Sequence, residues 1–119
     1  MTARSRLDQG GMTREQQKRL NAMCGDLAEQ VLWSVRMGGA DYPTRLHRDD
    51  WRHMWAGIVL GDRVAPNPEN PERFITLAAS SRMLTKKEAG DVMEMIAAFG
   101  SARGVVFSDP QTASYEAAA

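Results

Sequence analysis

The sequence contains a single cysteine, Cys24, which excludes a disulfide within the chain. Sparse cysteine is typical of proteins that fold in a reducing cytosol. No apolar run approaches the roughly 20 residues that a membrane-spanning helix requires, and the first residues lack the hydrophobic segment of a signal peptide. We therefore expect a cytoplasmic protein that does not enter a membrane.

The chain also lacks an excess of either charge, because 15 lysines and arginines balance 15 aspartates and glutamates. Net charge therefore gives no reason to expect attraction to nucleic acid, membranes or acidic ligands, and any surface that binds phosphate must be local. With 119 residues, of which 43% are hydrophobic, the chain is long enough for one domain with a buried core.

Sequence signatures of catalysis are missing as well. The chain contains no glycine-rich phosphate loop, no nucleophile elbow and no motif of a thiol enzyme. Cys24 lies among apolar residues at helical spacing, which favours a small buried residue over a reactive thiol. We expect no enzymatic activity and no cofactor.

One cluster has metal-binding residue types, namely His47, Asp49 and His53. Asp49 and His53 are four residues apart and would share a helix face. A metal site needs at least three ligands, and the chain offers no convincing third ligand at a recognisable spacing from Asp49 and His53. His47 falls where a helix N-cap is expected, and a carboxylate in the first turn suits the helix dipole. We expect no metal site; a metal-dependent nuclease remains a distant alternative.

Two segments in the first half of the chain have the apolar spacing of amphipathic helices. In the first, Thr13 and Gln16 form a capping box, and an apolar stripe runs from residue 20 to 31. The second covers Arg48 to Leu60 and ends before Gly61, which is a helix-stopping residue.

A third helix is predicted near the end of the chain. Thr85 is its N-cap, and Glu88 completes a second capping box. Apolar residues then follow at helical spacing from 89 to 99, which indicates a face turned to a core. Gly100 stands where a left-handed residue often ends a helix.

The segments between the helices are predicted to be mostly irregular. Residues 33–44 contain Gly38-Gly39 and are interpreted as a connection. Residues 64–73 contain three prolines, which exclude a helix or a central strand and predict an exposed loop. Residues 74–78 are predicted to form a strand that pairs with 105–107.

These elements predict an α+β fold that is mainly helical, with about three helices and a short two-stranded β element. Residues 1–12 are expected to be a flexible arm and residues 110–119 a tail, which leaves 13–109 as the folded domain.

Basic residues gather around both ends of the third helix. Arg82, Lys86 and Lys87 surround its N-terminus, where free backbone N–H groups and the helix dipole favour phosphate. Arg103 lies beyond its C-terminus, in a turn with glycines that would let a backbone approach a ligand. Aromatic residues suited to base stacking are Trp33, Tyr42 and Phe74.

The chain resembles the NinB (Orf) family of phage recombination mediators over about residues 15–109. The two most specific matching segments are Ser81-Arg-Met83 and Ala98-Phe-Gly-Ser-Ala-Arg-Gly104. Further segments agree in order and spacing: Gln16–Val31, Leu46–Trp51 and Ser108-Asp109.

The resemblance implies a non-catalytic homodimer in the cytoplasm of a bacterial host. Such a protein would bind DNA, preferably single strands, and would contact a host single-strand-binding protein and a recombinase during recombinase loading or strand annealing. Matched to the family motifs, Arg82 and Arg103 are candidate DNA contacts, and Lys18 and Arg19 match basic positions of the first helix. The alternative is a protein-interaction module that docks a single-strand-binding protein through residues 64–73 or the dimer face.

Overall fold

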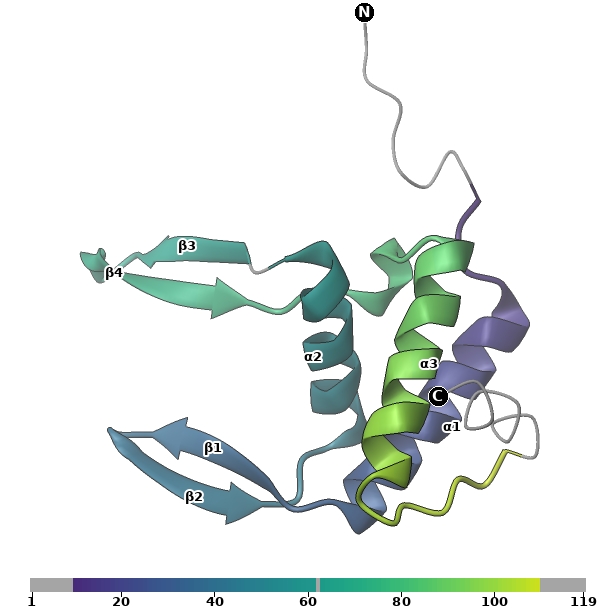
Figure 1. The fold of residues 1–119 in the computed structure, drawn as a ribbon. Coiled ribbons are helices and arrows are strands. Elements are labelled where there is room, and N and C mark those ends of the chain that lie inside the picture. The colour runs from purple at the N-terminus through teal and green to yellow at the C-terminus, as the bar shows by residue number, and fades with distance from the viewer. Residues whose placement is uncertain (1–9, 62, 110–119) are drawn as a thin grey trace, which may run out of the picture.

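The computed structural model describes residues 10–61 and 63–109, which form a body of helices with two projecting β-hairpins (Figure 1). The elements, in chain order, are α1 (Arg14–Gln30), β1 (Trp33–Met37), β2 (Ala40–Thr44), α2 (Arg48–Leu60), β3 (Arg63–Asn67), β4 (Asn70–Leu77), a 3₁₀ turn η2 (Ser81–Met83) and α3 (Lys86–Ser101). The predicted α+β class with three helices is confirmed.

The three helices begin at the predicted capping residues. The Thr13 hydroxyl accepts the Gln16 N–H at 3.1 Å, and the Thr13 N–H donates to the Gln16 side chain at 3.0 Å. Thr85 and Glu88 form the same reciprocal pair at 3.1 and 2.9 Å. Each pair satisfies two donors that a helix start leaves without partners, so these starts are fixed locally.

The core lies where α1, α2 and α3 meet. Its largest fully buried side chains are Leu20, Met23, Leu27, Trp51, Leu84, Met93 and Ile96. They come from the apolar faces of all three helices and from the residue after η2, as the spacing predicts. In the described ranges 10–61 and 63–109, no helix is both long and apolar enough to cross a bilayer.

The prediction of a connection at residues 33–44 was wrong, because this segment forms the β1–β2 hairpin, hereafter the first arm. Trp33 pairs with Thr44, and the ladder continues to Met37 opposite Ala40. Gly38 and Gly39 have φ values of 61° and 80°. These left-handed values match a two-residue type I′ turn, so the glycines that predicted a connection form the turn of a hairpin.

The prediction of a loop at residues 64–73 was also wrong, because the second arm, residues 63–77, is a β3–β4 hairpin. Its prolines are compatible with this structure because both strands of a two-stranded sheet are edges. Pro66 lies opposite Phe74, and the register shifts between Pro66 and Asn67. Both arms project from the body, and the radius of gyration of 16.1 Å exceeds the value of about 13 Å typical of a compact domain of 100 residues.

The predicted pairing of 74–78 with 105–107 was wrong. Residues 105–109 form a segment without helix or strand, here called the strap, that is bound to α1. The Gln30 amide accepts the Val106 N–H and donates to the Val106 carbonyl oxygen, both at 2.8 Å. The buried carboxylate of Asp26 accepts from the Ser108 N–H and hydroxyl at 3.0 and 3.1 Å. Side chains of α1 therefore satisfy backbone groups that were expected to bond to a strand.

The prediction that Gly100 ends α3 in a left-handed conformation was wrong. Gly100 is helical and buried, and a Cβ there would lie 2.4 Å from the Phe107 ring and 3.2 Å from Val105 Cβ. The left-handed residue after α3 is Gly104, with φ 75°. Gly100 is therefore a packing glycine that makes room for the strap.

The described end of the predicted N-terminal arm contacts the body. The Gly10 carbonyl oxygen accepts the Lys86 N–H at 2.9 Å, and Gly11 forms a β-bridge with Thr85. The rest of that arm and the predicted tail 110–119 lie outside the described residues.

Candidate nucleic-acid interface

Four of the six predicted basic residues lie at the two ends of α3, whereas Lys18 and Arg19 belong to α1. Arg82, Lys86 and Lys87 lie at its start, and Arg103 lies just beyond its last residue, Ser101. A helix of 16 residues is about 24 Å long. The structure therefore does not join all the predicted residues into one local site.

The start of α3 lies beside the start of α1. The Gln16 side chain donates to the Lys86 carbonyl oxygen at 3.0 Å, so the positive dipole ends of two helices are neighbours. The exposed residues Arg82, Lys86 and Lys87 belong to this region, hereafter the basic end, whereas Lys18 is exposed on α1. Lys87 forms an ion pair with Asp91 at 2.9 Å, which raises the pKa of Lys87 and compensates its charge.

Arg19 differs from the other predicted contacts. Its side chain is only 17% exposed and its Nε lies 3.7 Å from the Asp109 carboxylate. Asp109 belongs to the strap, so this ion pair ties α1 to the strap. A role in holding the strap fits Arg19 better than contact with a ligand.

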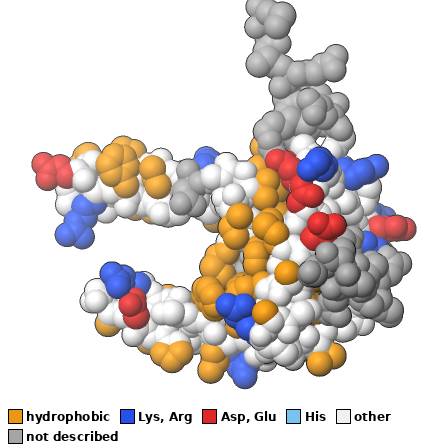
Figure 2. Space-filling model, in the orientation of Figure 1, with side chains coloured by type: hydrophobic (Ala, Val, Ile, Leu, Met, Phe, Trp, Pro, Cys, Tyr) orange, Lys and Arg blue, Asp and Glu red, His pale blue; other side chains and the backbone are white. Residues whose placement is uncertain are grey.

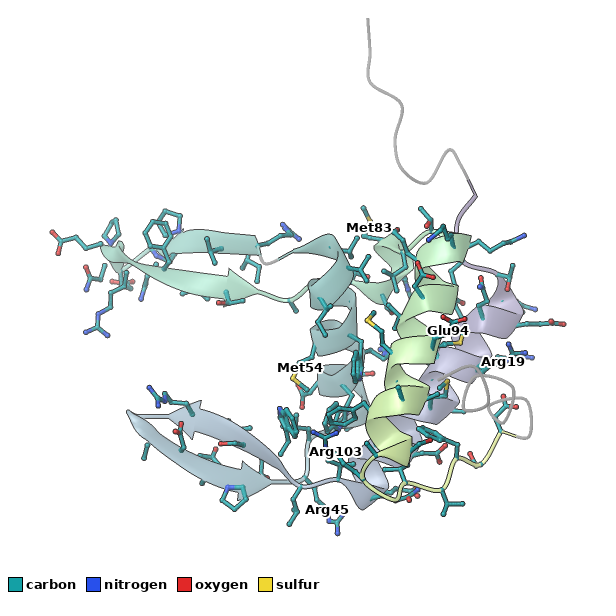
Figure 3. The ribbon with its side chains drawn as sticks, viewed as in Figure 1. Arg19, Arg45, Met54, Met83, Glu94 and Arg103 are labelled. Atoms are coloured by element: carbon teal, nitrogen blue, oxygen red, sulfur yellow. The ribbon has the colours of Figure 1, made fainter. Side chains whose placement is uncertain are left out.

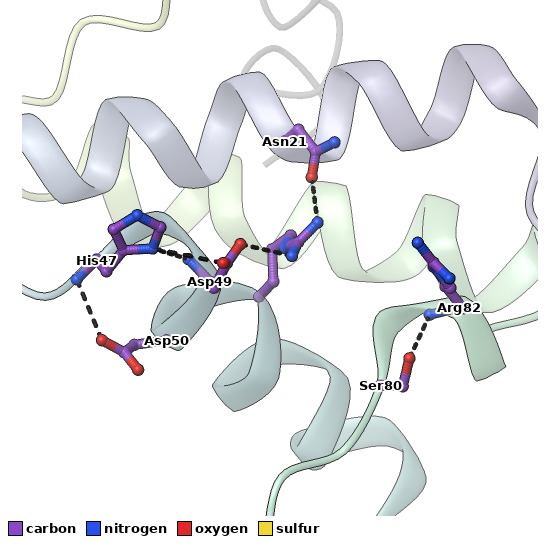
Figure 4. A network of polar contacts seen from close by, with 7 residues as sticks. Asn21, His47, Asp49, Asp50, Ser80 and Arg82 are labelled. Carbon is purple, nitrogen blue, oxygen red and sulfur yellow. Dashed lines mark hydrogen bonds and ion pairs between the residues drawn. The ribbon is translucent and has the colours of Figure 1, made fainter.

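Arg82 is exposed and borders a small pocket of about 90 Å³. Its backbone N–H donates to the Ser80 hydroxyl at 3.3 Å (Figure 4). The pocket is shared with Gln17, Asn21 and Arg52. Arg52 donates to Asn21 at 2.7 Å and pairs with Asp49 at 2.5 Å, so its charge is largely compensated. Arg82 is the pocket arginine whose charge can act on a ligand.

Arg103 is stacked on an aromatic ring at the base of the first arm (Figure 3). Its guanidinium carbon lies 3.7 Å from the centroid of the Phe99 ring and 5.7 Å from that of Trp33. Its Nη1 donates to the Phe99 carbonyl oxygen at 3.1 Å. The arginine is exposed, so these contacts orient its side chain without burying it.

The ring beneath Arg103 belongs to an aromatic cluster of Trp33, Trp51, Trp55 and Phe99. Phe99 lies 5.4, 5.7 and 5.4 Å from the centroids of Trp33, Trp51 and Trp55, with tilted or edge-on geometry. Such separations are typical of favourable aromatic pairs. Trp33 was a predicted stacking residue, and it does lie beside Arg103. Phe99 was predicted only as a core residue, and its spacing of four residues from Arg103 is the signal that could have linked the two.

The other two predicted stacking residues lie on the arms. Tyr42 is in the first arm and is 39% exposed, and Phe74 is in the second arm and is 65% exposed. Neither belongs to the aromatic cluster around Arg103.

An apolar groove between α2 and the second arm was not foreseen from the sequence. It has a volume of about 570 Å³ and is lined by Met54, Ile58, Leu77 and neighbouring residues. Figure 2 shows hydrophobic side chains along the hollow between the arms. The groove depends on the second arm being a hairpin, whereas the prolines of this segment predicted a loop.

Two of the three candidate metal residues, His47 and Asp49, serve local structure. The His47 side chain accepts the Asp49 N–H at 3.1 Å, and the His47 backbone N–H donates to the Asp50 carboxylate at 3.1 Å, which confirms the N-cap interpretation (Figure 4). Within 10–61 and 63–109, no group of three or more His, Cys, Asp or Glu side chains is arranged to hold a metal ion. Burial raises the pKa of the Cys24 thiol to about 12, although Arg52 and Arg48 oppose the shift, so this thiol is almost wholly protonated at neutral pH.

The fold and the site together define a class of small α+β protein in which a three-helix body carries two β-hairpin arms. The family model described as "NinB protein" matches residues 5–108. The chain belongs to the NinB family, which confirms the resemblance inferred from the sequence.

Similar proteins come from phages of enteric bacteria. The proteins called ninB in Salmonella phage P22 and in Escherichia phage lambda are each 28% identical to this chain over 95 residues. The match covers 80% of this chain and 59% of each relative, so the chain spans well under two thirds of their length. A solved structure described as "Structural Genomics, NinB" superposes with a TM-score of 0.66 at 26% identity, covering 98% of this chain and 72% of the other.

Proposed function

We propose that this protein binds single-stranded DNA without catalysing a reaction, and that it acts in phage recombination by assisting recombinase loading or strand annealing. Membership of the NinB family, with relatives from phages, supports the biological setting. The observation that carries the DNA proposal is the pair of features at the two ends of α3: the basic end, and Arg103 on its aromatic cluster.

These two features favour an extended polyanion over a small ligand. They are separated by the length of α3, about 24 Å for 16 residues. A small phosphate ligand would meet only one of them, whereas a nucleic-acid strand can contact both. Proteins that bind single strands combine cationic residues along the backbone with aromatic groups that receive bases.

A homodimer is the second part of the proposal. Isolated two-stranded hairpins are marginally stable in water, yet both arms project from the body (Figure 1). The second arm exposes Val64, Phe74 and Ile75 at 56, 65 and 44% of their surface. A second copy of the chain would cover these side chains and the neighbouring groove. A host single-strand-binding protein and a recombinase are proposed as further partners, in keeping with the family resemblance.

The DNA proposal is tested by titrating a fluorescein-labelled 20-nucleotide strand at several salt concentrations. We expect binding at low salt that weakens steeply as salt rises, because counterions are released from phosphates. Arg82→Ala removes one phosphate contact and should lower the slope of log K against log salt by about 0.7. The matched control is Arg36→Ala, since Arg36 is exposed but already paired with Asp41 at 2.8 Å. Absence of binding at low salt would refute the proposal.

A protein-interaction module without DNA contact is the alternative function. The exposed apolar side chains of the second arm and the groove beside α2 favour it. Capture of purified single-strand-binding protein, together with no oligonucleotide binding at low salt, would support this alternative. Loss of the capture in Phe74→Ser would assign the contact to the second arm.

A further inference from the structure

The position of Arg103, just beyond α3 and over the Phe99 ring, supports an inference that rests on the proposed function and refines it. We infer that Arg103 receives an unpaired nucleobase on the open face of its guanidinium plane, so that it is a base contact and not a phosphate contact. This contact would make the protein prefer single strands, because the faces of bases in a duplex are covered by their neighbours.

The geometry of Arg103 presents a flat surface. Its guanidinium carbon lies 3.7 Å from the Phe99 centroid, which is contact distance for a planar group lying on a ring. Phe99 lies against one side of the guanidinium, and the residue is exposed to solvent. Arginine planes and aromatic rings are both surfaces on which splayed bases stack.

The guanidinium is also held by contacts within the protein before any ligand binds. Nη1 of Arg103 is held at 3.1 Å from the Phe99 carbonyl oxygen, and the Phe99 ring is held by Trp33, Trp51 and Trp55. Trp51 and Trp55 are 1 and 8% exposed, so the support beneath the ring is part of the core. Little side-chain freedom would be lost when a base stacks, which favours binding.

The surroundings of Arg82 are polar, whereas Arg103 lies on an aromatic ring. Arg82 borders a pocket with polar neighbours, among them Gln17 and Asn21, and its charge is suited to a phosphate. Lysine can replace arginine as a point charge toward phosphate, but it lacks the planar group that stacks on rings and bases. The same substitution, Arg→Lys, should therefore have different effects at the two positions.

The test compares a 20-nucleotide thymidine strand with an abasic strand of equal length and charge, by fluorescence anisotropy at low salt. We expect the unmodified protein to bind the thymidine strand about tenfold more tightly, given the usual strength of base stacking on aromatic groups. Arg103→Lys should bring this ratio close to one, and Arg82→Lys should leave it unchanged. Thermal unfolding of both variants verifies that they fold.

The outcomes separate this inference from the function on which it rests. If the unmodified protein binds both strands equally well, the base contact is refuted while DNA binding stands. If it binds neither strand, the proposed function fails and the base contact fails with it. If Arg103→Lys folds and keeps the full tenfold ratio, Arg103 is not the residue that receives the base.

Discussion

Asp26 holds the strap on the helical body, and its replacement by alanine is the most direct test of how the end of α3 is positioned. The Asp26 side chain accepts two hydrogen bonds from Ser108, at 3.0 and 3.1 Å, and the residue is only 8% exposed. Asp26→Ala removes both bonds. The backbone N–H of Ser108 would then be left without its partner in a partly buried position.

The size of the effect follows from the type of bond. Hydrogen bonds to a charged group contribute about 1.5–3 kcal/mol each. Part of this gain is lost to the desolvation of a carboxylate in a buried position. We expect Asp26→Ala to lower the free energy of unfolding by about 2 kcal/mol, which corresponds to a fall in Tm of roughly 10 °C for a domain of this size.

The consequence for function comes from the order of the chain. Arg103 lies in the turn between α3 and the strap, so a loosened strap frees the turn that carries the stacked guanidinium. Asp26→Ala should therefore reduce the preference for thymidine over abasic strands at temperatures where the protein is still folded. Amide exchange at Ser108 should accelerate more than exchange in the middle of α3.

Urea denaturation followed by far-ultraviolet circular dichroism measures the stability change. Gln30→Ala is the matched control on the same helix, because it removes two neutral hydrogen bonds from the exposed side chain that holds Val106. This control should cost about 1 kcal/mol. If Asp26→Ala costs less than about 0.5 kcal/mol, or less than Gln30→Ala, the argument that a charged acceptor anchors the strap is refuted.

Two further predictions concern Cys24 and the first arm. The folded-state pKa of Cys24 is about 12, above its ordinary value of 9.0, so the stability that comes from burying the neutral thiol is complete below pH 9 and is lost as pH rises toward 12. Between pH 9 and pH 12, the free energy of unfolding of Cys24→Ala, measured by urea denaturation, should fall less steeply with pH than that of the unmodified protein. Equal slopes for the two proteins would contradict the burial argument. Gly39→Ala puts a Cβ on a residue with φ 80° and should weaken the first arm by about 1 kcal/mol, seen as faster amide exchange in β1 and β2. Gly90→Ala, in open space on α3, should instead raise stability by about 0.5–1 kcal/mol; a similar loss in both variants would show that φ is not the cause.

The helices could be predicted closely from the sequence because their signals are local. A capping box joins residues three apart, so Thr13 and Thr85 mark helix starts whatever the rest of the chain does. The apolar stripes likewise predicted which faces are buried. Arg103 and Phe99 are four residues apart, a spacing that brings side chains together on a helix, but Arg103 lies past the last helical residue, Ser101, so this contact was not predicted.

The arms could not be assigned as easily, because their signals have two meanings. A Gly-Gly pair both ends helices and forms the type I′ turn of a hairpin. Prolines exclude a central strand, but they are compatible with a hairpin in which every strand is an edge. Pairing in each arm joins neighbouring segments, whereas the prediction joined 74–78 to the distant 105–107.

The sequence by itself determined the three helices, their starts and buried faces, and the family to which the chain belongs. Only the tertiary structure decided which residues meet across long separations. It brought Trp33 to Phe99, placed the strap on Asp26 and Gln30, and separated the basic end from Arg103 by the length of α3. The physical reason is that caps and stripes depend on neighbours within a few residues, while these contacts depend on how whole helices pack.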